Sequence, residues 1–485
     1  MKILLINPVI APKRPPSVYN IGLGYIAASL IQDGHDVAVL DIEGYRYPSE
    51  KVSKMIRAME CDAIGIGTLI TGYKYVKWLI DEIRKAKPKV PIWMGNSIAS
   101  TIPDIILKDM DVDVVVMGEG EETVKELAKA TQGGDDLSKV DGICFRRDGH
   151  VIHTHEKALI KDIDTLPFPA WDLFPQSIYM RAPTGRLPLP VAYISTTRGC
   201  PYNCTYCYHP FKNRKVRVHS AERATEEIRI LKKKYNINSV VFADDLFMVN
   251  KKRVHEICDL IEKDKLNIKW LAASRVNTLD EDVLRHMRRA GCIHLGFGVE
   301  SGSQKILNNI KKNATVSQAK DAIRLCRKVG IDPVCSFMIG NVGETRETIF
   351  ETVSFITENI LERTSFFFAT PYPDTELYEY AKNRGKIKDE ISLFESYGEQ
   401  SLSLLVNFTD MSDDDLLELK KEAEGVILRR FIFRRPHKYI FYLWTIIADY
   451  YVKHGALKTF KGIAKMAGRT LARVPSMLYF RPIKL

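Results

Sequence analysis

The sequence has no long hydrophobic run and no regular set of paired cysteines. No stretch of 18 or more apolar residues occurs in the chain, which predicts that no segment spans a membrane. The first eight residues form one short apolar stretch and a turn, too short for a secretory signal with its cleavage site. Nine cysteines without regular pairing argue against a secreted disulfide framework and predict a reducing, cytoplasmic location.

Two further features are scarce. No G-x-G-x-x-G motif follows the first apolar stretch, so a plain dinucleotide-binding domain is not favoured. Acidic residues are almost absent from residues 429–485, which hold 13 Lys and Arg and a single acid, Asp449. The chain has 71 Lys and Arg against 60 Asp and Glu, so its net charge of +11 comes entirely from this last segment.

Three cysteines form the most informative motif. Cys200, Cys204 and Cys207 follow an apolar run at residues 191–195 with C-x3-C-x2-C spacing. Such a loop suits a [4Fe–4S] cluster, because four irons need four ligands and thiolate is the usual one. Three thiolates leave one iron with an open position for substrate or cosubstrate. There are two alternatives. The first is a structural zinc site that His209 completes, and the second is three thiols with no common role.

Strand-like and helical stretches alternate in the N-terminal part of the chain. Strands are predicted at residues 2–6, 36–40, 63–67, 91–94 and 112–117. The alternation predicts a doubly wound parallel α/β sheet, which binds ligands beyond the carboxyl ends of its strands. Residues at those ends are candidate ligand contacts, and most are small or polar, which would let a bulky ligand approach the backbone; they are Thr68, Leu69, Gly95, Asn96, Gly118, Glu119 and Gly120.

A second series of strands and helices follows the cysteine loop. Six strands are predicted, at residues 191–197, 239–243, 268–273, 294–299, 333–339 and 364–370. Parallel β/α units at this spacing predict an open, partial (β/α)6 barrel of the TIM type, with its chemistry at the carboxyl ends of the strands. The residues that follow these strands include Asp244, Asp245, Arg275, Glu300 and Gly340.

The cysteine loop resembles the C-x3-C-x-aromatic-C motif of the radical S-adenosylmethionine (SAM) enzymes, with Tyr206 at the aromatic position. The resemblance implies a [4Fe–4S] cluster whose free iron binds the amino and carboxylate groups of SAM. One electron from the cluster would then cleave SAM to a 5′-deoxyadenosyl radical.

The same resemblance implies roles for the strand-end residues of the barrel. Asp244 or Asp245 would meet the SAM amine, and Glu300 would hold the ribose or the amine. Arg275 would bind the carboxylate, and the backbone at Gly340 would face the adenine. For each acid, a helix cap or a first-turn charge is the alternative interpretation.

The order of segments resembles that of the cobalamin-dependent (class B) radical SAM enzymes. G-L-G-Y-I-A-A-S-L, D-G-H-D-V-A-V-L-D and V-V-M-G-E-G-E-E-T-V match the cobalamin-binding domain of that family. Two departures stand out. The D-x-H-x-x-G motif that supplies a cobalt-binding histidine is absent, so Leu69 or Ile70 is expected at the lower side of the corrin. In addition, Gly95-Asn96-Ser97 stands where the family more often has Gly-Gly.

Four segments are therefore predicted. Residues 1–150 form the cobalamin-binding domain, residues 151–190 a proline-punctuated linker, and residues 191–395 the radical SAM core. Residues 396–485 form a helical region that is basic and aromatic. Basic residues beside aromatics are typical of membrane interfaces, which predicts peripheral contact with the inner face of a membrane. A helical cap on the barrel is the alternative, and a nucleic-acid partner is not expected.

The resemblance implies an enzyme that transfers a methyl group to an unactivated carbon, and the C-terminal segment predicts a small, apolar or lipid-like substrate. A ferredoxin or flavodoxin is the expected electron donor. Ring formation with the same cofactors, as in the bacteriochlorophyll cyclase, and a non-catalytic cobalamin carrier are the alternatives. A methylthiotransferase of the tRNA type would need three more cysteines in the N-terminal domain, where only Cys61 and Cys144 precede residue 190.

Overall fold

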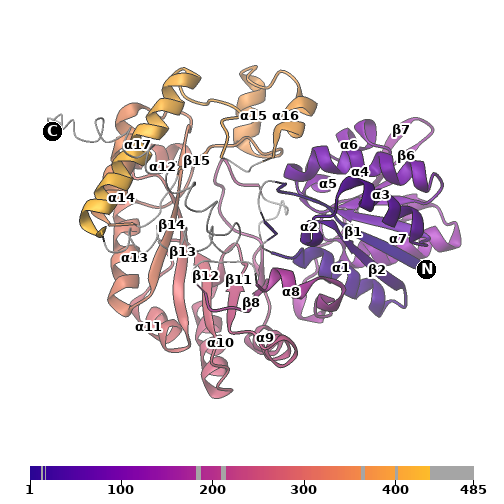
Figure 1. Cartoon of the computed structure of the whole chain (residues 1–485), viewed down its shortest axis with the longest axis horizontal. Coiled ribbons are helices and arrows are strands. Elements are labelled where there is room, and N and C mark those ends of the chain that lie inside the picture. The colour runs from indigo at the N-terminus through magenta and orange to yellow at the C-terminus, as the bar shows by residue number, and fades with distance from the viewer. Residues whose placement is uncertain are drawn as a thin grey trace, which may run out of the picture.

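The computed structural model describes residues 1–12, 15–16, 18–181, 187–208, 215–361, 366–398 and 402–436. It contains two large sheets with their own helices, which lie side by side (Figure 1). The predictions for His209 and for residues 437–485 fall outside the described residues. In the part that is described, no helix combines the length and the apolar character needed to cross a bilayer.

The N-terminal sheet has seven strands in the order β2-β1-β3-β4-β5-β6-β7. The first five are parallel and confirm the predicted doubly wound sheet, whereas β6 and β7 form an antiparallel hairpin that was not predicted. The strands are β1 (Lys2–Asn7), β2 (Asp36–Asp41), β3 (Ala63–Gly67), β4 (Ile92–Gly95), β5 (Val114–Val116), β6 (Ile143–Arg147) and β7 (His150–His153).

Helices cover both faces of this sheet (Figure 1). They are α1 (Ile21–Gln32), α2 (Ile42–Tyr45), α3 (Ser49–Ala58), α4 (Tyr73–Ala86), α5 (Ser97–Thr101), α6 (Pro103–Asp109) and α7 (Gly120–Gly133). Successive side chains of a strand point to opposite faces. In β1, Leu5 joins the core that includes α1 and α7, and Leu4 joins the core that includes α3 and α4. The near-continuous apolar strands are typical of a parallel sheet that is buried on both faces.

The second sheet has six strands in the order β15-β14-β13-β12-β11-β8, and every pairing is parallel. This confirms the predicted partial barrel. The strands are β8 (Val191–Ile194), β11 (Ser239–Phe242), β12 (Lys269–Ser274), β13 (Cys292–Glu300), β14 (Asp332–Ile339) and β15 (Phe366–Phe368). A short hairpin of β9 (Thr197–Arg198) and β10 (Arg217–Val218) follows β8. Because the strands are parallel, their carboxyl ends form one edge of the sheet.

The second half of the chain contributes the remaining helices, and one of them packs against the N-terminal domain. They are α8 (Gln176–Tyr179), α9 (Ala221–Tyr235), α10 (Lys251–Lys263), α11 (Glu281–Arg289), α12 (Gln304–Asn309), α13 (Val316–Val329), α14 (Arg346–Glu358), α15 (Glu376–Asn383), α16 (Glu390–Ser396) and α17 (Asp413–Arg434). Helix α16 packs on α4, with the rings of Phe394 and Tyr73 5.5 Å apart, and α17 lies along α14.

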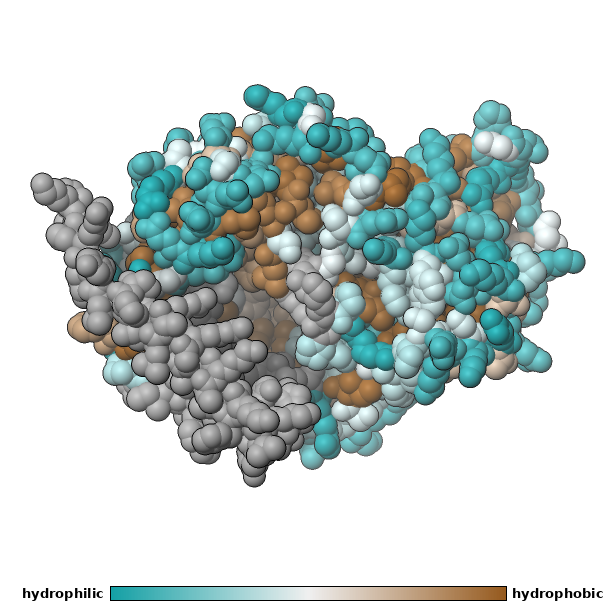
Figure 2. Space-filling model, turned by 45° about the horizontal axis from the view of Figure 1, so that its top comes forward, coloured by the Kyte–Doolittle hydropathy of each residue, from teal (hydrophilic) through white to brown (hydrophobic). Residues whose placement is uncertain are grey.

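The linker between the sheets is bound to the N-terminal domain. The Ala170 N–H donates to the carbonyl of Gly24 at 3.0 Å, and the Tyr179 hydroxyl donates to the Asp41 carboxylate at 2.9 Å. The first sheet ends at His153 and the second begins at Val191, and the domain boundaries given above stay predictions. The face shown in Figure 2 is largely hydrophilic over the N-terminal domain, and hydrophobic side chains show near the middle of the molecule.

Candidate active site

The cysteine loop follows β8 and the short strand β9. Cys204 is buried, Cys200 is half-buried and Cys207 is exposed at its surface. Desolvation of the sulfur and, after it, the neighbouring Cys204, Asp245 and Cys200 together raise the pKa of the Cys207 thiol to about 12. The three thiols therefore lie close enough together to interact. Their role as cluster ligands stays a prediction.

Two backbone hydrogen bonds hold this loop against the barrel. The Thr205 N–H donates to the carbonyl of Ile310 at 3.1 Å, and the Leu377 N–H donates to the carbonyl of Thr205 at 2.9 Å. Arg275, at the end of β12, lies against the same loop. Its guanidinium stacks on the Tyr202 ring at 3.6 Å, and its Nη1 lies 3.7 Å from Cys204 Sγ. The structure thus places Arg275 beside a thiol, and its predicted contact with the SAM carboxylate stays a prediction.

Glu300 lies inside the barrel and is held by two donors. Its Oε1 accepts hydrogen bonds from the Tyr206 hydroxyl at 3.1 Å and from Lys312 Nζ at 3.2 Å. Glu300 has a φ of 70°, in the left-handed region that is costly for residues with a side chain. A Cβ on Gly298 would lie 2.2 Å from Glu300 Oε1, so only glycine at that position permits this arrangement.

Glu300 and Tyr206 line a hollow inside the barrel, which we call the barrel chamber. It has a volume of about 310 Å³. Its lining residues are Tyr206, Glu300, Ser336, Met338, Phe367, Phe368, Thr370 and Tyr372. The chamber therefore combines a charged end with a mostly apolar wall.

The two adjacent aspartates after β11 have different positions. Asp244 is buried and accepts hydrogen bonds from the backbone N–H groups of Thr196 and Thr197 and from the Thr196 hydroxyl, at 2.5 to 2.9 Å. Burial raises its pKa to about 6 although these donors act in the opposite direction. Asp245 instead lines the interdomain cavity described below. Of the pair, Asp245 is the better candidate for a ligand contact.

Gly340 lies in a turn that a buried carboxylate holds. Glu344 accepts hydrogen bonds from the backbone N–H groups of Gly340 and Asn341 at 2.5 and 3.1 Å. Burial raises the pKa of Glu344 to about 7, and the two N–H donors oppose that shift. Gly340 has a φ of 86°, which glycine adopts without strain. The turn is thus fixed at the carboxyl end of β14, and its predicted contact with adenine stays a prediction.

A hollow larger than the barrel chamber lies between the two sheets, and we call it the interdomain cavity. Its volume is about 410 Å³. From the N-terminal domain it is lined by residues of β1, β4, β5, α1 and α7 and by residues 65–67, 95–96 and 118–120. From the barrel it is lined by Ser195, Thr197, Arg198, Gly199, Ala243 and Asp245. Residues 197–199 lead directly into Cys200, so the cavity reaches the cysteine loop.

Most of the N-terminal residues predicted from strand ends do line this cavity. They are Gly95, Asn96, Gly118, Glu119 and Gly120. At the end of β3 the lining comes from residues 65–67, directly before the predicted Thr68 and Leu69. Thr68 is buried, and its hydroxyl donates to the carbonyl of Leu69.

Glu119 and Glu121 form ion pairs with arginines of the β9–β10 hairpin. Arg198 binds Glu119 at 2.7 Å through Nη1 and binds Glu121 through Nη2, and Arg217 binds the other oxygen of Glu119 at 2.6 Å. Burial alone would raise the pKa of Glu119, but the hydrogen bonds from Arg217 and Arg198 hold it below its usual value. We call these four residues the interdomain ion-pair cluster. It ties the end of β5 to the residue two positions before Cys200.

Known proteins share both halves of this arrangement. The family model for the radical SAM superfamily matches residues 194–356, and that for the B12 binding domain matches residues 8–128. An uncharacterized methyltransferase of Pyrococcus horikoshii is 35% identical over 392 residues, which are 79% of this chain and 83% of that protein. This chain belongs to the radical SAM proteins with a B12-binding domain. It is therefore an enzyme of a family that uses a [4Fe–4S] cluster, SAM and cobalamin.

Two further proteins that are similar to this chain show the range of activities among cobalamin-dependent radical SAM enzymes. The anaerobic magnesium-protoporphyrin IX monomethyl ester cyclase of Rubrivivax gelatinosus is 26% identical over 82% of this chain and 72% of its own length. The solved structure of the radical SAM methyltransferase TsrM from Kitasatospora setae has a TM-score of 0.68 at 20% identity, over 80% of this chain and 77% of that one. That likeness shows a shared fold.

The interdomain cavity of this radical SAM enzyme fits a large cofactor such as cobalamin. A Cβ added to Gly95 or Gly118 would meet no atom within 4 Å, so it would enter open space. Trp93 is 3% exposed and lines the cavity, and its indole N–H has no hydrogen-bond partner among the described residues. Buried donors in folded proteins are nearly always satisfied, so a bound group with an acceptor would complete this wall.

The cysteine loop and the barrel chamber fit the other two cofactors. Three thiols in one loop match the donor set of a cluster, and the Arg275 guanidinium lies beside one of them, Cys204. Glu300 and Lys312 are of the charge types that suit the ammonium and the carboxylate of SAM. Sequence reasoning missed Lys312, Trp93 and Arg198. Only Arg198 had a local signal, because it directly precedes Gly199-Cys200.

Proposed function

We propose that this enzyme transfers a methyl group to an unactivated carbon of a small, mainly apolar substrate. One observation carries the proposal: the interdomain cavity is lined both by the strand ends of the B12-binding domain and by residues 197–199 next to Cys200. A group held on the first sheet would thus lie beside the cysteine loop of the second. When bound, the cluster supplies an electron to SAM and cobalamin carries a methyl group.

The chain's own residues contribute binding and orientation. The interdomain ion-pair cluster holds the strand ends of the first sheet against the residues that precede Cys200. We propose that Glu300, supported by Tyr206 and Lys312, binds the ammonium or the ribose of SAM at the charged end of the barrel chamber. The same chamber supports an apolar substrate, since Met338, Phe367 and Phe368 line it.

The test is anaerobic incubation of the cluster- and cobalamin-loaded enzyme with SAM that carries a trideuterated methyl group, a reductant and fractionated cell extracts. A product 17 mass units above its precursor, formed together with 5′-deoxyadenosine, supports methyl transfer. A product that has lost hydrogens without gaining label supports ring formation, which the cyclase relative favours as the second candidate. Absence of 5′-deoxyadenosine under reducing conditions would leave a cobalamin carrier.

Two partner proposals rest on weaker features. Cys207 is exposed, which supports electron entry at this side of the loop from a ferredoxin or flavodoxin. The end of α17 carries Phe433, 88% exposed, and Leu428, 45% exposed, beside Arg429 and Arg430. These side chains support peripheral membrane contact by residues 429–485. Co-sedimentation with anionic vesicles, compared with a chain that ends at Glu424 and so lacks these side chains, tests this; equal binding of both chains would contradict it.

A further inference from the structure

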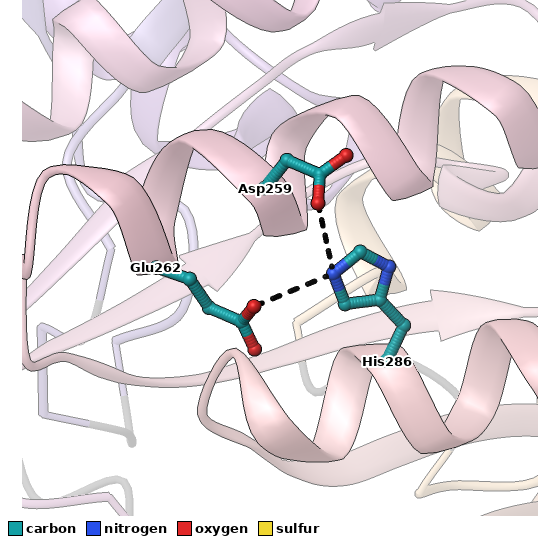
Figure 3. A group of neighbouring side chains, drawn as sticks. All are labelled: Asp259, Glu262 and His286. Atoms are coloured by element: carbon teal, nitrogen blue, oxygen red, sulfur yellow. Dashed lines mark ion pairs between the residues drawn. The ribbon is translucent and has the colours of Figure 1, made fainter.

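A group of side chains of the types that ligate metal ions lies away from both cavities, between α10 and α11 (Figure 3). Asp259 and Glu262 project from α10, and His286 projects from α11. The donor atoms of these three residues lie within 4.8 Å of one another. Asp259 and Glu262 are three residues apart and therefore share one face of their helix.

His286 is the buried member of the group and points its Nε2 at both carboxylates. The residue is 7% exposed, and Nε2 has no hydrogen-bond partner among the described residues. It lies 3.4 Å from Asp259 Oδ1 and 3.7 Å from Glu262 Oε2, beyond the usual range of a direct N–H···O bond. A tetrahedral site with metal–ligand distances of about 2.1 Å has ligand–ligand distances of about 3.4 Å, close to those observed.

The other ring nitrogen of His286 has a partner that would orient it. His286 Nδ1 lies 2.8 Å from Nδ1 of His255, which is also on α10. His255 Nε2 in turn lies 3.5 Å from an Asp282 carboxylate oxygen. If His286 donates its Nδ1–H to His255, its Nε2 presents a lone pair to the space between the two carboxylates. A histidine that ligates a metal usually donates its second ring N–H in this way.

The electrostatic surroundings favour a cation at this point. Asp259 and Glu262 lie in the last part of α10 and His286 in the last turn of α11, and the carboxyl ends of helices carry partial negative charge. Arg289 approaches Glu262 at 3.7 Å, but through Oε1 and not through the Oε2 that faces His286. Two carboxylates thus converge on one imidazole, with no arginine between them and the imidazole in the described structure.

We propose that His286, Asp259 and Glu262 bind a divalent transition-metal ion of the Zn²⁺ type, with water as the fourth ligand. Imidazole with carboxylates is a donor set that Zn²⁺ accepts in tetrahedral geometry. Helices α10 and α11 run back from the carboxyl ends of their preceding strands, so the site lies at the amino-terminal side of the barrel, where residues serve stability rather than catalysis. The ion would clamp α10 to α11.

The test is calorimetric titration of Zn²⁺ into chelator-washed enzyme whose cysteine loop already holds its iron–sulfur cluster. The wild-type protein should bind one equivalent that Asp259→Asn and His286→Gln both lose. Asp259 is exposed, so its substitution leaves the fold intact even if the buried His286→Gln does not fold. His255→Ala should weaken binding about 10- to 100-fold, as expected for the loss of an orienting partner. Glu256→Gln, an exposed acid on the same helix, is the matched control and should bind like wild type.

Zinc-edge X-ray absorption of the loaded wild type should show nitrogen and oxygen ligands. The ion should also raise the thermal unfolding midpoint of wild type and of Glu256→Gln, but not that of Asp259→Asn. Equal zinc binding by wild type and Asp259→Asn, a sulfur ligand shell at the zinc, or no binding by wild type would each overturn the proposal. In those cases the three side chains pack together without a metal ion.

Discussion

The two sheets present opposite kinds of surface to the regions where cofactors are expected. The first sheet offers the bare backbone of Gly95 and Gly118 and the apolar side chains around Trp93. The second offers the charged side chains of Arg275 and Glu300. The first sheet is therefore suited to recognise a bulky ligand by shape, and the second to recognise a small charged one by hydrogen bonds and ion pairs.

The first domain does carry charged residues near the cavity, so a lack of charge does not explain the difference. Glu119 and Glu121 stand at the end of β5, but their carboxylates bind Arg198 and Arg217 of the barrel. The acids of the first sheet thus join the two halves, and the backbone beside them is left to line the cavity. The four predictions below test whether shape and charge separate in this way.

The largest effect should come from Cys204→Ala. Its thiol is buried and lies beside Arg275, so removing it breaks the cluster donor set at its centre. We expect loss of bound iron and of 5′-deoxyadenosine formation. Cobalamin binding should persist, because the glycine-lined wall belongs to the other sheet. Iron analysis and the visible spectrum of bound cobalamin measure the two effects separately.

Loss of both cofactors in Cys204→Ala would contradict separate binding by the two sheets, since it would mean that they bind their cofactors as one unit. Cys258→Ala is the matched control, because Cys258 is buried in α10 away from the loop. That variant should keep its iron.

Arg198→Gln should have the next largest effect, a loss of stability. It leaves Glu121 without this buried partner and Glu119 with Arg217 alone. Removing one member of a buried ion pair costs about 3 to 5 kcal/mol, because a desolvated charge loses its counter-charge. The denaturant midpoint should fall, and the double variant Arg198→Gln/Glu121→Gln should lose less than the sum of the two single variants.

The control for that cycle is Arg285→Gln, which removes an exposed pair with Glu281 and should cost no more than about 0.5 kcal/mol. If Arg198→Gln is equally mild, the interdomain ion-pair cluster does not hold the domains together.

Gly95→Leu tests recognition by shape. A Cβ at Gly95 meets no atom within 4 Å, and Gly95 lines the interdomain cavity, so a leucine side chain there should enter the cavity. Overfilling a packed site costs about 1 to 3 kcal/mol, which corresponds to a loss of cobalamin affinity of up to about 100-fold. Iron content should not change. Gly425→Leu, on the surface of α17, is the control. Unchanged cobalamin affinity in Gly95→Leu would place the cofactor elsewhere.

Both sheets could be predicted from the sequence because their strands are short apolar runs between amphipathic helices. Strand ends were predictable for the same reason, and Gly95, Gly118 and Glu300 were found from them. The β6–β7 hairpin was missed although its signal was present. Asp148-Gly149 have φ values of 50° and 78°, and an Asp-Gly pair between apolar stretches is a strong hairpin signal.

Other features depend on neighbours that are distant in sequence. Asp244 accepts hydrogen bonds from Thr196 and Thr197 because β11 lies beside β8, a pairing across 47 or 48 positions. Arg198 meets Glu119 across 79 positions. The sequence showed that these residues stand at strand ends, but side-chain direction at a strand end follows from which element lies next to it.

The smallest predicted effect concerns a buried carboxyl group of the barrel that, unlike Glu300, accepts no hydrogen bond from the described residues. Glu227 on α9 is buried, and neither of its oxygens has a hydrogen-bond partner among the described residues. Burial raises its pKa to about 8 from an ordinary value of 4.5, and Arg223 only partly opposes this shift. The folded protein therefore binds this proton more tightly than the unfolded chain does.

Because the folded pKa is the higher one, stability should be greatest below the unfolded value and should fall as the pH rises from about 4.5 to about 8. Glu227→Gln removes the ionisation and should flatten the curve by about 2 kcal/mol between pH 6 and pH 8. Denaturant midpoints at both pH values measure the difference, with the exposed neighbour Glu226→Gln as control. If stability changes with pH in the same way in wild type and in Glu227→Gln, Glu227 is ionised in the folded protein and must have a counter-charge. Glu227 would then be a paired charge like the other charged residues of the barrel.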